Sequence, residues 1–350
     1  MPNETLRVVI ASPLEPEHVE RMRADAPSSI EILYEPALLP PTRYVADHNG
    51  VDGYELTPEQ QRQWSDLLAT ADILFDFPWN DRRHPRSYAP RVQWIQTTSA
   101  GVGRAAERMG IQPDELLITT ASGVHARPLA EFVFLVLLMA VKDHRRLASG
   151  QSERRWERFC ADELTGTTLA IIGAGKIGRE IARIARAFDM SPVGMARDSR
   201  PERAAELGLD RLYARSELPV MLAAADALVL CAPHTPDTDN LIGPAEFAAM
   251  KPGIIFINIA RGQLVDEEAL LATLNDGTIS FAGLDVFRTE PLPPDSPFWT
   301  MPNVLVNHHS ASTSHHENAR ITDIFLHNLR AFTAGRVEDM RNVLDIERMY

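Results

Sequence analysis

Cysteine is scarce in this chain: Cys160 and Cys231 are its only two cysteines, and neither belongs to a CxxC pair or a His/Cys cluster. This excludes a disulfide framework and a zinc finger as the basis of the fold, so we expect no metal and a reducing, cytoplasmic location. The first residues also lack the basic stretch and apolar core of a signal peptide, and we expect none.

Positive charge is in deficit. The chain has 35 Lys and Arg against 48 Asp and Glu, which gives a formal net charge of −13. Nucleic-acid-binding surfaces are usually basic, so we expect no nucleic-acid partner, whereas a locally positive pocket for a small anion is not excluded. The longest apolar run, 132–141, is about half the ~20 residues that a membrane span needs, and it predicts a buried helix.

Alternating elements are abundant. The length of 350 residues predicts two domains, and short β-branched apolar runs alternate with amphipathic stretches. The predicted strands are 6–11, 30–34, 73–77, 92–97, 117–120, 168–173, 192–196, 227–231, 254–258, 280–286 and 304–306. The predicted helices are 15–26, 57–70, 131–147, 179–188, 201–207, 266–275 and 314–334. This order predicts an α/β fold with two Rossmann-like or flavodoxin-like domains, each built on a parallel sheet.

The long helical patterns indicate where the chain changes domain. The pattern at 131–147 leaves the first α/β series, and the pattern at 314–334 returns to it. We therefore expect a discontinuous substrate-binding domain at 1–122 and 312–350, with an inserted dinucleotide-binding domain at 123–311. A cleft between the two would receive the substrate.

A glycine-rich turn follows the predicted strand at 168–173. Residues 173–178 have the pattern G-x-G-x-x-G and lead into an amphipathic helix. The first glycine permits the tight turn, the second lets the backbone approach a pyrophosphate, and the third lets helix and strand pack closely. The helix N-terminus adds free N–H groups and a positive dipole end. The predicted dinucleotide contacts of this loop are Gly173, Gly175, Lys176, Ile177 and Gly178.

The end of the next strand bears on the choice between NAD and NADP. NAD enzymes place an acidic residue there, about 20 residues after the glycine loop, to bind the ribose hydroxyls. Ala196 occupies this position here, and Arg197 follows it. Because arginine can pair with a 2′-phosphate, these residues favour NADP. Asp198 lies one or two positions late, and a shift in register would restore it as a ribose ligand, so NAD stays open.

Four further segments occur in a fixed order after the glycine loop. They read CAPHTP at 231–236 with Thr238, INIARG at 257–262 with LVD at 264–266, GLDVF at 283–287 with EPLP at 290–293, and NHHSA at 307–311. Together with the loop, the series resembles the D-isomer-specific 2-hydroxyacid dehydrogenases, which include glyoxylate/hydroxypyruvate reductases and phosphoglycerate dehydrogenase. The resemblance runs from about Thr97 to Arg330.

The resemblance implies a catalytic trio of Arg261, Glu290 and His309. Reduction of a 2-keto acid to the D-2-hydroxy acid needs a hydride from a nicotinamide, a proton for the carbonyl oxygen and a counter-charge for the carboxylate. A protonated histidine donates protons well near neutral pH, a carboxylate beside it favours its charged form, and arginine grips a carboxylate with two hydrogen bonds. The alternatives without a catalytic role are that Arg261 caps a strand end and that Glu290 is an ordinary loop carboxylate.

The adjacent histidines raise a question of register. Related proteins usually have Pro-His at this point, and the strand at 304–306 aligns His308 with the proline and His309 with the catalyst. The resemblance also assigns cofactor contacts to Cys231, Ala232, Pro233, Thr238, Ile259, Ala260, Arg261, Asp285, His309 and Ala311. A structural role is the alternative for the buried carboxylate of Asp285.

The loop at 98–103 is the predicted substrate loop. A concave run of N–H groups after a strand can form an anion nest, and the resemblance places the substrate carboxylate on Ala100, Gly101 and Val102, with Arg261 and His309 completing the contacts. Related proteins often have aspartate where this chain has Gly103, so how the loop is anchored stays open. A simple glycine turn is the alternative.

The resemblance further implies a small 2-keto or 2-hydroxy acid as substrate, such as glyoxylate or hydroxypyruvate, and a homodimer through the cofactor domain. The apolar helix at 132–141 suits that interface, and the core of a monomer would explain it equally. Formate dehydrogenases share the fold but would be expected to have glutamine in place of Glu290. A non-catalytic, nucleotide-sensing relative such as the C-terminal-binding corepressors retains much of the trio and stays an alternative.

Overall fold

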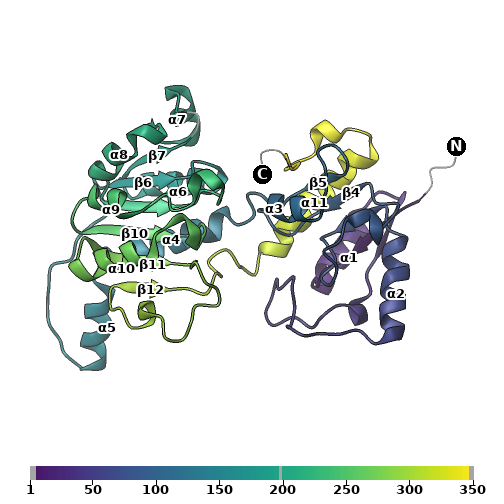
Figure 1. Ribbon diagram of the computed structural model, residues 1–350, viewed down its shortest axis with the longest axis horizontal. Coiled ribbons are helices and arrows are strands. Elements are labelled where there is room, and N and C mark those ends of the chain that lie inside the picture. The colour runs from purple at the N-terminus through teal and green to yellow at the C-terminus, as the bar shows by residue number, and fades with distance from the viewer. Residues whose placement is uncertain (1–4, 197–198, 347–350) are drawn as a thin grey trace. The chain divides into compact units, whose positions relative to one another are not determined.

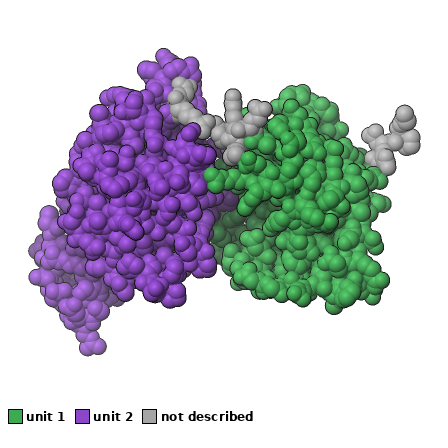
Figure 2. All heavy atoms as spheres, viewed as in Figure 1, with its two compact units in different colours: residues 1–124, 313–350 green, residues 125–312 purple. Residues whose placement is uncertain are grey.

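The computed structural model describes residues 5–196 and 199–346, which form two compact units (Figures 1 and 2). Unit 1 comprises Met1–Val124 and Thr313–Tyr350, and unit 2 comprises His125–Ser312. Their boundaries differ by one or two residues from the predicted domain limits. Arg197 and Asp198, on which part of the cofactor prediction depends, lie outside the described residues. Within the described ranges, no helix has the length and apolar character needed to cross a membrane.

Unit 1 contains a five-stranded parallel sheet in the order β2-β1-β3-β4-β5. Its strands are β1 (Leu6–Ile10), β2 (Ile30–Leu33), β3 (Ile73–Phe75), β4 (Trp94–Gln96) and β5 (Leu117–Thr119). Its helices are α1 (Pro16–Asp25), α2 (Pro58–Ala69), α3 (Gly103–Arg108) and α11 (Glu317–Thr333). The cores show that α2 and α3 cover one face, and α1 and α11 the other. The strand order reverses between β1 and β3, so their carboxyl ends flank the switch point.

Unit 2 contains a seven-stranded parallel sheet in the order β12-β11-β10-β9-β6-β7-β8. Its strands are β6 (Thr168–Ile172), β7 (Ser191–Met195), β8 (Arg211–Tyr213), β9 (Ala227–Leu230), β10 (Ile254–Asn258), β11 (Ile279–Leu284) and β12 (Val304–Val306). Its helices are α4 (Ala126–Val141), α5 (His144–Ser152), α6 (Lys176–Ala187), α7 (Pro201–Leu207), α8 (Leu218–Ala224), α9 (Pro244–Ala248) and α10 (Glu267–Asp276). The order reverses between β6 and β9, which is where a doubly wound sheet binds its dinucleotide.

Alternation along β6 explains why this sheet is covered on both sides. Leu169 and Ile171 point into the core formed with α4 and α6, whereas Ala170 and Ile172 point into the core formed with α8, α9 and α10. A strand buried on both faces is apolar at every position, as the run at 169–172 is. The predicted α/β class with two parallel sheets is therefore confirmed.

The prediction of one helix over 131–147 was wrong. The helix α4 begins at Ala126, and Pro128 is tolerated in its first turn, where a missing N–H costs nothing. It ends at Val141, after which Asp143 adopts a left-handed conformation (φ +48) and caps α5 by accepting a hydrogen bond from the Arg146 N–H. The helices α6 and α11 begin three residues from their predicted starts, and β8, α3, α8 and α9 were not predicted.

Candidate active site

The glycine loop lies at the switch point of the seven-stranded sheet. Gly173 has φ +107, and a Cβ on it would lie 2.5 Å from the backbone nitrogen of Ala232, at the end of β9. A Cβ on Gly178 would lie 2.6 Å from the carbonyl oxygen of Gly173. A Cβ on Gly175, by contrast, would meet nothing within 4 Å. The chain itself thus requires the first and third glycines, whereas the second leaves room for a bound group, as a dinucleotide site needs.

The start of α6 completes this loop. Gly175 is the N-cap residue, and Lys176 and Ile177 open the helix, so their N–H groups lie at its positive end. Ala196 follows β7 directly and is half-buried. The N–H groups at the start of α6 fit the phosphates of a dinucleotide.

The segment after β9 is held by its own side chains. The Cys231 thiol donates to the carbonyl oxygen of Gly173 (3.0 Å), and burial raises the pKa of this thiol to about 12, so it stays a donor. The Thr238 hydroxyl donates to the Pro233 carbonyl (2.8 Å) and accepts from the Thr235 N–H (2.8 Å). Cys231 and Thr238 therefore shape the loop that faces the glycine turn, and His234 pairs with Asp239 at 2.8 Å.

Two of the three predicted catalytic side chains are in direct contact. His309 Nδ1 lies 2.8 Å from Glu290 Oε2, and both side chains are more than one-third exposed. Glu290 Oε1 accepts the Phe287 N–H at 2.9 Å, which fixes the carboxylate to its own loop. Since Nδ1 faces a carboxylate, it carries a proton, and Nε2 is left as the ring nitrogen that can exchange one.

The backbone of His309 is in an uncommon conformation. Its φ is +52, and the segment around it is bound to Asp285, a carboxylate that is 2% exposed. The donors to Asp285 Oδ1 are the Ser310 N–H (2.9 Å), the Ala311 N–H (3.0 Å) and the Asn307 amide (2.8 Å), while the His309 N–H donates to the Asp285 carbonyl (2.9 Å). Burial raises the pKa of Asp285, and these hydrogen bonds offset part of that effect. Such over-determination is what maintains a strained backbone at a functional site.

Arg261 lies on a segment fixed by two residues that sequence reasoning did not single out. Asn258 accepts the Ala260 N–H (3.0 Å) and donates to the Arg261 carbonyl (3.1 Å), closing the turn after β10. A Cβ on Gly262 would lie 2.0 Å from the carbonyl carbon of Phe287, so this turn packs directly on the segment that carries Glu290. The only early signal was the polar Asn258 at the end of an apolar strand.

The Arg261 side chain is exposed. Its Nη1 donates to the Ala260 carbonyl at 2.6 Å, and it forms no salt bridge with any residue that the structure describes. Ile259 and Ala260, predicted to contact the cofactor, are each 5% exposed. The guanidinium is thus the unneutralised cation of the trio, available for an anion.

The predicted substrate loop belongs to unit 1. Ala100 is half-buried, Gly101 is exposed, and Val102 precedes α3. The backbone N–H groups of 100–102 donate to no other residue in the described part of the chain. These unused donors fit an anion nest.

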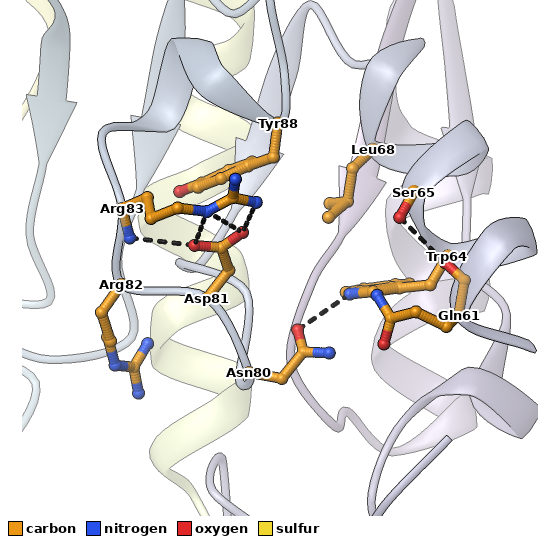
Figure 3. Close-up of a pocket in the computed structure, with 9 residues that line it drawn as sticks. All are labelled: Gln61, Trp64, Ser65, Leu68, Asn80, Asp81, Arg82, Arg83 and Tyr88. Carbon is orange, nitrogen blue, oxygen red and sulfur yellow. Dashed lines mark hydrogen bonds and ion pairs between the residues drawn. The ribbon is translucent and has the colours of Figure 1, made fainter. Parts of the chain in front are cut away.

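A separate hollow of about 580 Å³ lies in unit 1 between α2 and the segment 80–88 (Figure 3). Four of its polar side chains form two pairs: Trp64 Nε1 donates to Asn80 (3.0 Å), and Arg83 binds Asp81. None of the predicted site residues lines it. In the described ranges, no group of three His, Cys, Asp or Glu side chains could hold a metal ion.

The glycine loop yields a prediction that separates folding from binding. We expect Gly173→Ala to lower the melting temperature by several degrees, because its Cβ collides with backbone and its φ is left-handed. Gly175→Ala should leave the melting temperature within about 1 °C of the wild type but raise the KM for the nicotinamide cofactor about tenfold or more. Thermal melts and cofactor titrations of both variants check this; a normal cofactor KM in Gly175→Ala would contradict it.

The comparisons with known proteins agree in one direction. A family model described as D-isomer specific 2-hydroxyacid dehydrogenase, NAD binding domain, matches residues 134–311. The glyoxylate reductase of Korarchaeum cryptofilum is 33% identical over 259 residues, covering 71% of this chain and 75% of that protein. The glyoxylate/hydroxypyruvate reductase B of Citrobacter koseri is 32% identical over 289 residues, covering 81% and 88%. A solved structure of a D-isomer specific 2-hydroxyacid dehydrogenase family protein from Aeromonas salmonicida has a TM-score of 0.78 at 27% identity, covering 98% and 99%.

Proposed function

Since the chain belongs to the D-isomer specific 2-hydroxyacid dehydrogenases, a family of NAD(P)-dependent oxidoreductases, we propose that it reduces a small 2-keto acid to the D-2-hydroxy acid. The observation that carries this proposal is the contact of 2.8 Å between His309 Nδ1 and Glu290 Oε2 on strand-end loops of unit 2. The names of the relatives from K. cryptofilum and C. koseri support glyoxylate or hydroxypyruvate as the substrate.

In the proposed reaction, the bound nicotinamide supplies a hydride to C2 of the keto acid. His309 donates the proton from Nε2 to the carbonyl oxygen, so that one hydride and one proton convert the ketone into an alcohol. Glu290 accepts a hydrogen bond from the Nδ1–H of His309 and stabilises the imidazolium before the proton is transferred. Arg261 binds the substrate carboxylate and polarises the carbonyl. The N–H groups of 100–102 in unit 1 are proposed as further donors to the carboxylate.

We propose NADP as the preferred dinucleotide, with NAD as the second choice. The support is Ala196 at the position where an acidic residue would bind the ribose hydroxyls, followed by Arg197 in the sequence. We also propose a cytoplasmic location, which the scarcity of cysteine supports.

The test is a panel of small 2-keto acids with NADPH and NADH, followed by loss of the reduced-cofactor absorbance. We expect turnover of glyoxylate or hydroxypyruvate, with kcat/KM for NADPH at least about tenfold above that for NADH. A strong preference for NADH would overturn the choice of NADP. Binding of NADPH without turnover of any 2-keto acid would favour a nucleotide-sensing protein, and oxidation of formate would favour a formate dehydrogenase.

We also propose a homodimer formed through unit 2. Leu135 on α4 and Leu147 on α5 are each 50% exposed, and α5 buries none of its residues. Exposed large apolar side chains on two successive helices are typical of an interface. Sedimentation equilibrium should give twice the chain mass of 39.0 kDa, and a single-chain mass would reject the dimer.

A further inference from the structure

The end of β3 is fastened to the start of the substrate loop. The strands β3 and β4 are parallel neighbours with Phe75 opposite Gln96, so Asp76 and Thr97 leave the sheet side by side. The Asp76 N–H donates to the Gln96 carbonyl at 2.7 Å. The Thr98 hydroxyl donates to Asp76 Oδ2, and Thr98 is 3% exposed. A single carboxylate thus holds the first turn of the loop.

The other side of the turn is held by its own residues. The Thr97 hydroxyl donates to the Ser99 carbonyl at 2.8 Å, and the Ala121 N–H donates to the same carbonyl at 3.1 Å. The Thr97 and Thr98 hydroxyls and the Ser99 carbonyl are therefore all engaged. The N–H groups of 100–102 donate to no other described residue, so they stay available to an anion.

Asp76 adopts a conformation that few side chains tolerate. Its φ is +71, in the left-handed region where Asn, Asp and Gly are enriched. Its other oxygen, Oδ1, accepts the Phe77 N–H at 2.8 Å, so both carboxylate oxygens are engaged. Strain of this kind persists where the surrounding contacts over-determine it, and it marks functional sites.

We propose that Asp76 is the positioning residue that anchors the substrate loop through Thr98, in the absence of an aspartate at position 103. This rests on the proposed function, because the loop is taken to bind the substrate carboxylate. Asp76 acts through Thr98 and not by contact, since a carboxylate beside the bound anion would repel it. Its engaged oxygens keep the loop in shape while the N–H groups of 100–102 bind the substrate.

The chain offers a matched control on the same strand. Asp72 stands directly before β3, at the amino-terminal end of the strand, whereas Asp76 follows its carboxyl end. Asp72 is also buried, and both of its carboxylate oxygens accept hydrogen bonds. It accepts the Arg7 N–H (2.9 Å) and the Arg91 Nε–H (3.0 Å). Loss of Asp72 should lower stability without reaching the substrate loop, so it separates a local role from general damage to unit 1.

The experiment compares Asp76→Gly, Thr98→Val and Asp72→Ala with the wild type. Glycine is used because it keeps φ +71 without strain, so the loss is that of the carboxylate. We expect Asp76→Gly and Thr98→Val each to raise the KM for the 2-keto acid about tenfold, the loss of one hydrogen bond to a charged group, with kcat changed by less than about threefold. The KM for NADPH should not change, and Asp72→Ala should keep both KM values.

Two readouts distinguish anchoring from a merely structural role. Asp76→Asn keeps an acceptor and tolerates the conformation, so its KM for the 2-keto acid should be close to the wild-type value. The double variant Asp76→Gly/Thr98→Val should have a KM no higher than that of either single variant. The Ala121 N–H is bonded to the Ser99 carbonyl, and the Ala105 and Ala106 N–H groups to the Val102 carbonyl. Hydrogen exchange of these three amides, measured without substrate, should quicken in Asp76→Gly and Thr98→Val alone.

Unchanged exchange of these amides, or an unchanged KM in both variants of an active enzyme, would overturn the anchor while leaving the proposed function intact. If the wild type turns over no 2-keto acid, the proposed function fails instead. The exchange data then decide whether Asp76 holds the loop.

Discussion

Replacement of His309 by alanine is expected to lower kcat/KM for 2-keto acid reduction by about 10²- to 10⁴-fold, the usual contribution of a positioned general acid. The reason is the placement of its imidazole, which bonds Glu290 at 2.8 Å through Nδ1 and keeps Nε2 for the proton. Steady-state kinetics with saturating NADPH measure the effect, and NADPH binding itself should survive.

His308 is the natural control, because it is the same residue type one position earlier. Its ring lies against Trp299, with centroids 5.9 Å apart, and no carboxylate hydrogen bond to it was found among the described residues. His308→Ala should change kcat/KM by less than about threefold, within the range of a surface substitution. A larger loss of turnover in His308→Ala than in His309→Ala would show that the register of the two histidines is wrong.

Arg261→Ala is expected to lower kcat/KM by about 10²- to 10³-fold, with the KM for the keto acid rising more than the KM for NADPH. The exposed guanidinium has no salt-bridge partner in the described ranges, so it is free to neutralise the substrate carboxylate. Arg261→Lys should recover little, because an ammonium lacks the two parallel donors of the planar fork.

Arg288 controls for the loss of a nearby arginine. It donates to Asn240 (2.7 Å) and to the Val265 carbonyl (2.9 Å), so its role is to tie loops together. Arg288→Ala should lower the melting temperature and leave kcat/KM close to the wild-type value. Wild-type KM for the keto acid in Arg261→Ala would contradict the assigned role of Arg261.

The regular elements were predictable because their pattern is local. The run at 169–172 is apolar at every position, and Thr57 with Gln60 forms the capping box expected of a helix start. The break at Asp143 was missed, although the apolar run ends at Val141 and residues 142–146 contain no apolar side chain. A left-handed aspartate that caps a new helix depends on the side chain's own hydrogen bond and not on periodicity.

The trio was predictable from resemblance, but what holds it was not. The clash that enforces glycine at 262 involves Phe287, and the carboxylate of Asp285 binds residues more than twenty positions away. The contact of Asp76 with Thr98 likewise follows from the pairing of β3 with β4. Contacts of this kind depend on which strands become neighbours, and a single sequence carries no local signal for them.

The division of labour between the two units bears on how such an enzyme can diverge. The glycine loop, Arg261, Glu290 and His309 are all built within unit 2, where close backbone packing ties their segments together. The carboxylate-binding loop proposed at 100–102 is built within unit 1, on a separate sheet with its own cores. The residues proposed to bind the cofactor and to transfer the proton therefore all lie in one unit. On this proposal, we expect substitutions in unit 1 to alter the substrate range and to leave the residues proposed for proton transfer in place.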